Sequence, residues 1–467
     1  MISDSMFHPR SIAVVGASEG YFNGVTQVFL DTLKTCGYRG NIYPVNPKFE
    51  KVSGFKCYLS VRDIPDVVDY VISIVPSSAT PKLVEDCIAK GVKTLHLYTS
   101  GFAETDEAER GELQKSLVAA ARKGGVRIIG PNCMGLFIPS EGITYSPAFP
   151  MELGNVSFIS QSGSYSLMVV RGAGARGVRF NKVVSYGNAA DIDECDLLEF
   201  LAGDPETAVI AAYIEGTKDG RRLQRVLTEA VKKKPVVIIK KGGTVAGSRG
   251  ASSHTGAMAG DDKVWDALLR QTGAIRVEDA EEMIDMLTTF TFFKLPKGRR
   301  ALVMGNGGGP SVRAADDCER GGLTLPELPA GLRQEMKKYS PVAGSMLRNP
   351  IDVGGYHFDW APVIDLLSKW DDTDMIIWQI APDIEPFDKD LFFQFCLDQR
   401  AKWLKDFKAS GKPVAVSVHA SESDIAYEVL KITRRQCVEL GMPFYPSVYR
   451  AARAIDRYIG YYERLGR

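Results

Sequence analysis

The chain of 467 residues carries 57 basic and 57 acidic side chains, so its formal net charge is zero. A neutral chain has no overall field with which to attract nucleic acid or anionic lipid, and we expect neither as a partner. Hydrophobic residues make up 45% and charged residues 24%, as in globular proteins with filled cores, and no apolar run approaches the ~20 residues that cross a bilayer. The N-terminal residues lack a secretion-type pattern, and the eight cysteines show no C-x-x-C spacing, which favours reduced thiols in a cytoplasmic protein.

Short apolar segments alternate with amphipathic ones over the first part of the chain. The apolar segments have strand length and lie at residues 11–16, 41–47, 69–76, 93–101 and 126–132. Most of the amphipathic stretches between them end on glycine, as helices often do. This alternation predicts a parallel sheet covered by helices on both faces, which binds ligands at the carboxyl ends of its strands.

The same rhythm begins again near residue 155 and once more near residue 301. The second stretch ends with helices predicted over 263–271 and 280–292, and the third closes with helices from Asp424 onward. We therefore predict an α/β fold of three doubly wound parallel-sheet domains. Their limits are residues 1–140, 150–293 and 298–467.

The first predicted strand ends in the turn Gly16-Ala17-Ser18. A glycine turn that leads into a helix lets backbone N–H groups approach a phosphate, although a tight turn without a ligand gives the same pattern. Lys48 follows the second strand, where a protein that binds NAD would carry an acidic residue. A cation there favours a phosphorylated ribose, as in coenzyme A or NADP, and an ordinary surface lysine is the alternative.

Two further segments end at the same predicted edge of the sheet. Thr99-Ser100-Gly101 closes the fourth strand, and Asn132-Cys133 follows the fifth. Both would face a bound ligand. No histidine or acidic partner stands at a recognisable spacing from Cys133, so we interpret it as a small pocket-lining residue rather than as a nucleophile.

The second domain opens with Ser162-Gly163-Ser164 between a strand and a helix. A helix N-terminus rich in serine and glycine is a preformed anion site, because its N–H groups are free and its dipole favours negative charge. Simple N-capping by a serine is the alternative, and the two roles are compatible.

Residues 242–260 are dominated by Gly, Ala, Ser and Thr and hold one histidine, His254. This composition predicts a loop that exposes its backbone. A lone histidine is more often structural, but small neighbours make this imidazole accessible, and a neutral imidazole is a nucleophile near pH 7 when a second group holds its other nitrogen. Glu215, at the end of a strand in the same domain, is a suitable orienting carboxylate, and a solvated loop acid is the alternative.

Seven motifs follow one another in the order GAS, VNPK, TSGFAE, GPNCMG, SQSG, YIEG and SSHTGA. In this order they resemble the α subunit of NDP-forming acyl-CoA synthetases, the ADP-forming acetate–CoA ligases related to the succinyl-CoA synthetase α chain. The resemblance covers residues 9–293, and GNGGGPSVRAAD and NPIDVGG in the third domain fit the ADP-forming subgroup. It implies an N-terminal Rossmann-like CoA-binding domain followed by two flavodoxin-like domains.

The reaction that the resemblance implies is acyl-CoA + ADP + phosphate ⇌ carboxylic acid + CoA + ATP, through an acyl phosphate and a phosphohistidine. By motif match, His254 would carry the phosphoryl group and Glu215 would orient it. Ser162, Gly163 and Ser164 would hold the phosphate, and the acyl group would lie near Asn132 and Cys133. Coenzyme A would lie across the turns of the first domain, at Gly16, Ala17, Ser18, Glu19, Gly20, Lys48, Thr99, Ser100 and Gly101.

The resemblance also implies a partner. The ATP-grasp part that holds ATP or ADP and Mg²⁺ has no counterpart in this sequence, so we expect a separate β subunit in an α2β2 assembly and no metal site on this chain. Leu167 stands where succinyl-specific relatives carry a tyrosine, which leaves the carboxylic acid unassigned. Two alternatives stay open, an NADP-dependent oxidoreductase, favoured by the first domain and Lys48, and a CoA-binding regulatory subunit without turnover.

Overall fold

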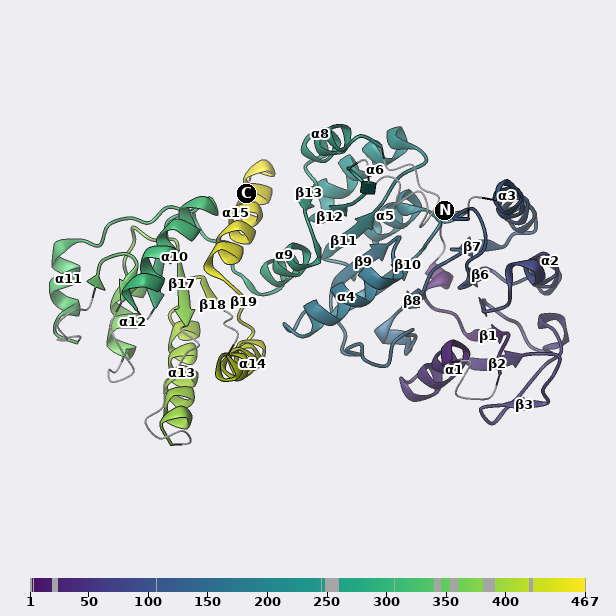
Figure 1. The fold of residues 1–467 in the computed structure, drawn as a ribbon, viewed down its shortest axis with the longest axis horizontal. Coiled ribbons are helices and arrows are strands. Elements are labelled where there is room, and N and C mark those ends of the chain that lie inside the picture. The colour runs from purple at the N-terminus through teal and green to yellow at the C-terminus, as the bar shows by residue number, and fades with distance from the viewer. Residues whose placement is uncertain are drawn as a thin grey trace. The chain divides into compact units, whose positions relative to one another are not determined.

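Buried apolar strands alternate with helices along the chain, and the strands assemble into mainly parallel sheets (Figure 1). The predicted α/β class is confirmed. The computed structural model describes residues 2, 4–18, 24–105, 107–244, 246–247, 260–305, 307–339, 346–352, 360–380, 391–419 and 423–466. The chain divides into two compact units, one of residues 1–174 with 179–283 and the other of residues 175–178 with 284–467. Among the described residues, no helix is both long enough and apolar enough to cross a membrane.

The first sheet has the parallel strand order β2-β1-β5-β6-β7, and β3 and β4 form a small antiparallel pair beside it. Its elements are β1 (Ser11–Val15), α1 (Gly24–Thr35), β2 (Asn41–Val45), β3 (Lys51–Val52), β4 (Phe55–Lys56), β5 (Tyr70–Ser73), α2 (Thr80–Lys90), β6 (Thr94–Leu97), α3 (Ala108–Lys123) and β7 (Arg127–Ile129). Strand residues such as Ala13, Val71 and Leu95 pack into one apolar core with residues of α2 and α3. The strand order reverses at β1, which is where open α/β sheets bind ligands.

The second sheet has the order β13-β12-β11-β9-β10-β8. Its elements are β8 (Gly135–Phe137), β9 (Val156–Ser160), α4 (Gly163–Gly174), β10 (Phe180–Ser185), α5 (Glu194–Gly203), β11 (Val209–Ile214), α6 (Gly220–Lys233), β12 (Val236–Lys240), α8 (Asp262–Thr272) and β13 (Ile275–Val277). Helices α5, α6 and α8 pack side by side. Because parallel crossovers are right-handed and the strand order reverses at β9, α4 lies on the opposite face of the sheet.

Strand β8 is the antiparallel edge of the second sheet, although it follows closely on β7 of the first sheet. Its residues Gly135, Leu136 and Phe137 pair with Ser185, Val184 and Val183 of β10. The range predicted for the first domain, residues 1–140, therefore supplies a strand to the second sheet. The three domain limits stay a prediction.

The third sheet lies in the other unit and has the order β15-β16-β14-β17-β18-β19, with β15 antiparallel. Its strands are β14 (Ala301–Gly305), β15 (Met346–Leu347), β16 (Ile351–Asp352), β17 (Met375–Ile380), β18 (Val414–Val418) and β19 (Phe444–Tyr445). The helices of this part of the chain are α9 (Ala280–Phe292), α10 (Gly308–Arg320), α11 (Ala330–Met336), α12 (Ala361–Ser368), α13 (Leu391–Ala409), α14 (Asp424–Glu439) and α15 (Val448–Arg464). The parallel strands of all three sheets therefore share one topology, with the first strand between the second and the third.

Candidate active site

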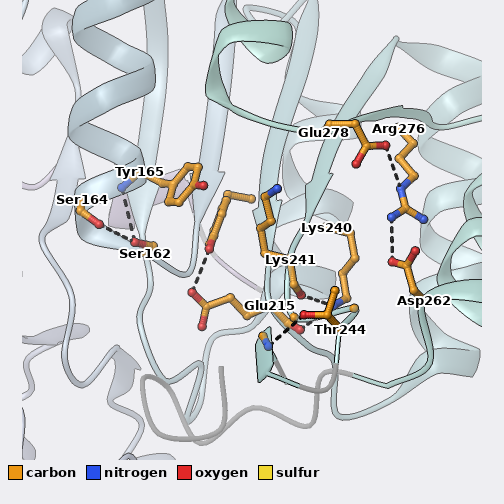
Figure 2. A pocket seen from close by; sticks show the side chains of 14 residues that line it. Ser162, Ser164, Tyr165, Glu215, Lys240, Lys241, Thr244, Asp262, Arg276 and Glu278 are labelled. Carbon is orange, nitrogen blue, oxygen red and sulfur yellow. Dashed lines mark hydrogen bonds and ion pairs between the residues drawn. The ribbon is translucent and has the colours of Figure 1, made fainter. Parts of the chain in front are cut away.

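A cavity of about 590 Å³ opens at the carboxyl edge of the second sheet (Figure 2). The start of α4, the residues after β11 and β12, the start of α8 and the neighbourhood of β13 all contribute to its lining. Carboxyl ends of parallel strands and N-termini of helices meet at this edge, so polar side chains and free N–H groups converge there. Its position fits the general rule for ligand sites in open α/β sheets.

One side of the cavity is the N-terminus of α4. Ser162 precedes the helix, is almost fully buried, and its Oγ lies 3.0 Å from the Oγ of Ser164. The Ser162 Oγ accepts a long hydrogen bond of 3.4 Å from the backbone N–H of Tyr165, so N-capping by this serine is present but weak. Both serines line the cavity, as expected of a phosphate-binding helix terminus.

Glu215 follows β11 and lines the same cavity. It is only 4% exposed, so it is not a solvated loop acid. The amide oxygen of Gln161 accepts hydrogen bonds from the backbone N–H groups of Glu215 and Gly216, which fixes the strand end. The Tyr213 hydroxyl donates to Glu215 Oε1 at 3.2 Å, and the pKa of Tyr213 is raised by burial and by the charge of Glu215.

Charged residues that the sequence analysis missed form the opposite side. Arg276 on β13 pairs with Asp262, the first residue of α8, at 2.7 Å, and with Glu278 at 3.8 Å. Lys240, the last residue of β12, is almost fully buried and is followed by Lys241. The sequence offers one weak signal, because these two lysines end an apolar strand at the edge predicted to bind ligands, but a lysine in that position is also typical of an exposed strand end.

His254 lies outside the described residues, so its predicted role stays a prediction. Gly247, the last described residue before it, and Asp262, the third described residue after it, both line the cavity. Glu215 and the serines at the start of α4 line it as well.

The first predicted turn lies at the carboxyl end of β1. Gly16 has φ +89°, a left-handed conformation that favours glycine, and a side chain there would also approach Val75 to 3.3 Å. The side-chain amide of Asn46 donates to the backbone oxygen of Ala17 at 2.7 Å and so ties this turn to the end of β2. Ser18 is buried and Lys48 is exposed at the same edge, whereas Glu19 and Gly20 lie outside the described residues.

The second predicted turn, Thr99 to Gly101, is held by a carboxylate that the sequence analysis did not single out. Glu104 Oε1 accepts the N–H of Gly101 at 2.5 Å, and Oε2 accepts the side-chain amide of Asn188 at 2.5 Å. Gly101 has φ +100°, and Ser100 is exposed. The turn after β6 is therefore connected to the residues that follow β10.

Asn132 and Cys133 lie where the first sheet meets the second. The side-chain amide of Asn132 donates to Asn188 Oδ1 at 3.4 Å. Cys133 is buried with Sγ 3.7 Å from the backbone oxygen of Leu97, and burial raises the pKa of its thiol, which argues against a nucleophile. The next residue, Met134, donates its backbone N–H to the Ser185 hydroxyl at 3.1 Å and so fixes this loop to the second sheet.

Two family models match the chain, a CoA binding domain over residues 10–139 and a succinyl-CoA ligase like flavodoxin domain over residues 153–290. The chain is 41% identical over 350 residues to the acetate–CoA ligase (ADP-forming) II subunit alpha of Pyrococcus furiosus, which covers 75% of this chain and 76% of that one. It is 32% identical over 477 residues to the acetate–CoA ligase (ADP-forming) II of Archaeoglobus fulgidus, covering 98% of this chain and 67% of that longer one.

Among solved structures, the chain resembles the dinucleotide-forming acetyl-coenzyme A synthetase 1 of Ca. Korarchaeum cryptofilum, determined in complex with phosphate and ADP. The TM-score is 0.82 at 30% identity, over 99% of this chain and 97% of that one. These relatives are ligases and synthetases, which removes the support for an NADP-dependent oxidoreductase. The chain belongs to the α-subunit family of the ADP-forming acetate–CoA ligases, which are acid–thiol ligases.

Proposed function

We propose that this chain is the CoA-binding and phosphoryl-carrying part of an ADP-forming acyl-CoA synthetase that interconverts acyl-CoA, ADP and phosphate with carboxylic acid, CoA and ATP. A carboxylate is a poor electrophile, so it must become an acyl phosphate before the sulfur of CoA attacks it. A histidine that carries the phosphoryl group divides this difficult transfer into easier steps.

In the direction of ATP formation, a phosphate oxygen attacks the thioester carbonyl, the C–S bond breaks and CoA leaves with the sulfur. A ring nitrogen of His254 then attacks the phosphorus of the acyl phosphate, and the carboxylate leaves as the P–O bond breaks. An oxygen of ADP finally takes the phosphoryl group and frees the imidazole. Glu215 would accept a hydrogen bond from the other ring nitrogen and so orient the ring.

The observation that carries this proposal is the composition of the cavity on the second sheet. It combines a helix N-terminus suited to a phosphate, a buried carboxylate suited to orienting an imidazole, and the described residues on both sides of the segment that contains His254. A structural role for Ser162 or Glu215 alone would not require that they share one cavity.

For coenzyme A, we propose the carboxyl edge of the first sheet, across Gly16–Gly20, Lys48 and Thr99–Gly101. The left-handed Gly16 supports this assignment because it lets the backbone approach a phosphate, and the exposed Lys48 can pair with one. For the acyl group, Asn132 is a better candidate than the buried Cys133, since its amide offers both a donor and an acceptor.

For the partner, we propose an ATP-grasp β subunit that binds ADP or ATP with Mg²⁺, in an α2β2 assembly in the cytoplasm. The name of the Pyrococcus furiosus relative, a subunit alpha, supports a second subunit. The match covers 67% of the longer Archaeoglobus fulgidus relative. That relative therefore contains further residues, which supports a second component in the complete enzyme. Mg²⁺ would neutralise phosphate charge during transfer.

The proposal is tested by incubating the chain with acetyl-CoA and labelled inorganic phosphate, and with other acyl-CoA thioesters in the same way. We expect acid-labile, base-stable label on the wild-type protein, and none on His254→Asn, because an amide cannot form the phosphoramidate. Glu215→Gln should lower the rate of labelling by about tenfold to a hundredfold, because an amide holds the imidazole less firmly than a carboxylate that accepts its N–H.

His419→Asn is the matched control, because His419 lies in the other unit and contacts Arg313. Its labelling should equal that of the wild type. Label that survives His254→Asn would contradict the assignment of the phosphohistidine.

A further inference from the structure

Lys240 is a buried cation at the end of β12 that lines the cavity. Its side chain is only 4% exposed. Its Nζ donates to the backbone oxygen of Glu215 at 2.8 Å and to that of Lys241 (Figure 2). The centre of the Trp265 ring lies 4.9 Å from the same Nζ. Two of its three N–H donors therefore join the carboxyl ends of β11 and β12.

Charged groups from three neighbouring elements face this ammonium, namely Glu215 after β11, Asp262 at the start of α8 and Arg276 on β13. Burial is the main cause that lowers the pKa of Lys240 to about 8, the charge of Arg276 acts in the same direction, and the two carboxylates oppose the shift. Arg276 is itself paired with carboxylates, at 2.7 Å with Asp262, 3.7 Å with Asp266 and 3.8 Å with Glu278. At a pH below the pKa of Lys240, both Lys240 and Arg276 are positively charged. The charge of Arg276 is then neutralised by more ion pairs with carboxylates than the charge of Lys240.

We propose that Lys240 is a positioning residue for phosphoryl transfer, whose ammonium fixes the two strand ends beside the phosphoryl site and supplies the charge that holds a phosphate dianion there. The inference rests on the proposed function, since it assumes that the cavity takes a phosphate. A dianion inside a cavity of low dielectric favours the charged form of a neighbouring lysine. Phosphate binding should therefore be coupled to proton uptake by Lys240.

Lys234, which lies just before the same strand, is a matched control. It precedes β12 at the amino end, whereas Lys240 ends it. Its Nζ also donates to backbone oxygens, those of Leu201 at 2.7 Å and of Asp204, and burial lowers its pKa as well. Both lysines therefore donate to backbone oxygens, but only Lys240 lines the cavity.

The test is calorimetric titration of the full chain with inorganic phosphate at about pH 8, where Lys240 is half protonated, in two buffers of different ionisation enthalpy. We expect the wild type to bind phosphate with net uptake of protons. Lys240→Met should bind phosphate about tenfold more weakly or worse, without uptake, because a charged partner is lost. Lys240→Arg should bind without uptake, because a guanidinium stays charged. Lys234→Met should behave as the wild type.

Equal affinity and equal proton uptake in Lys240→Met and the wild type would overturn the inference, as would uptake that persists in Lys240→Arg. If the Met variant does not fold, the Arg variant decides. Its guanidinium stays charged at the pH of the titration and therefore cannot take up a proton when phosphate binds. Labelling of His254 by acyl-CoA and phosphate separates the two claims. If the wild type is labelled but the Lys240 substitutions leave phosphate binding unchanged, this inference alone is rejected. If the wild type is not labelled, both the inference and the proposed function are rejected.

Discussion

Glu104 accepts hydrogen bonds from residues of the first sheet and from the loop after β10 with its two carboxylate oxygens. One oxygen binds the N–H of Gly101 and the other binds the side-chain amide of Asn188, both at 2.5 Å. The oxygen of that amide in turn accepts from Asn132 at 3.4 Å. A single carboxylate thus connects the turn proposed to hold coenzyme A with the residue proposed to hold the acyl group.

Replacing Glu104 by glutamine should raise the KM for CoA about fivefold to tenfold with a small change in kcat. A carboxylate accepts at both oxygens, whereas an amide must offer N–H at one of them, so one charge-assisted hydrogen bond of about 1–2 kcal/mol is lost. Steady-state kinetics of the complete enzyme measure both constants. Glu112→Gln is the control, because Glu112 is exposed on α3 and pairs with Lys115. An unchanged KM for CoA in Glu104→Gln would contradict the positioning role.

The start of α4 packs closely against the loop that follows β7. A Cβ added at Gly163, the first residue of the helix, would lie 2.7 Å from Cγ of Met134. Close approach of the helix to this loop is therefore possible only for glycine. The helix N-terminus proposed for phosphate and the loop proposed for the acyl group are in van der Waals proximity as a consequence.

Gly163→Ala should destabilise the protein by about 1–3 kcal/mol, the usual cost of overpacking a tight contact. Gly220→Ala is the matched control, since Gly220 is also the first residue of a helix and a Cβ there meets no atom within 4 Å. That change should be neutral or slightly stabilising, because alanine favours helix over glycine. Urea unfolding of both variants checks the difference, and equal midpoints would show that Met134 moves away without cost.

Packing between the first and second sheets depends on a buried carboxylate. Asp191, in the loop after β10, has a fully buried side chain. It accepts from Arg122 Nε at 2.5 Å, from Arg127 Nε at 2.9 Å and from the backbone N–H of Ile128 at 2.7 Å. The two sheets belong to one compact unit, and this cluster is a polar link between them.

Asp191→Ala should lower the free energy of unfolding by about 2–3 kcal/mol, because the buried carboxylate accepts charge-assisted hydrogen bonds from two arginines and its loss leaves the buried N–H of Ile128 without that acceptor. Asp365→Ala should cost less than about 0.5 kcal/mol, since that aspartate of α12 makes an exposed ion pair with Lys369, the residue that follows the helix. Denaturant unfolding followed by circular dichroism compares the two. A small effect of Asp191→Ala would mean that water solvates the two arginines when the carboxylate is gone.

The long apolar segments made the α/β class predictable, and the helix predicted over 280–292 coincides with α9. The strands that escaped prediction are short. β8 and β19 have three and two residues, too few for any periodicity to be visible. In the candidate site, small-residue motifs identified Ser162 and an acidic strand end identified Glu215, whereas Lys240 and Glu104 have the sequence signature of ordinary surface residues and gain their meaning only from burial and partners.

Strand β8 has a practical consequence for any dissection of the chain. Removal of residues 1–140 would delete β8 and leave the edge of β10 without its partner over Val183–Ser185, with unpaired N–H and C=O groups. Such an open border is a template for pairing between molecules, so the remaining fragment should aggregate. A fragment cut ahead of Gly135 keeps that border closed and is the better choice for isolating the second sheet.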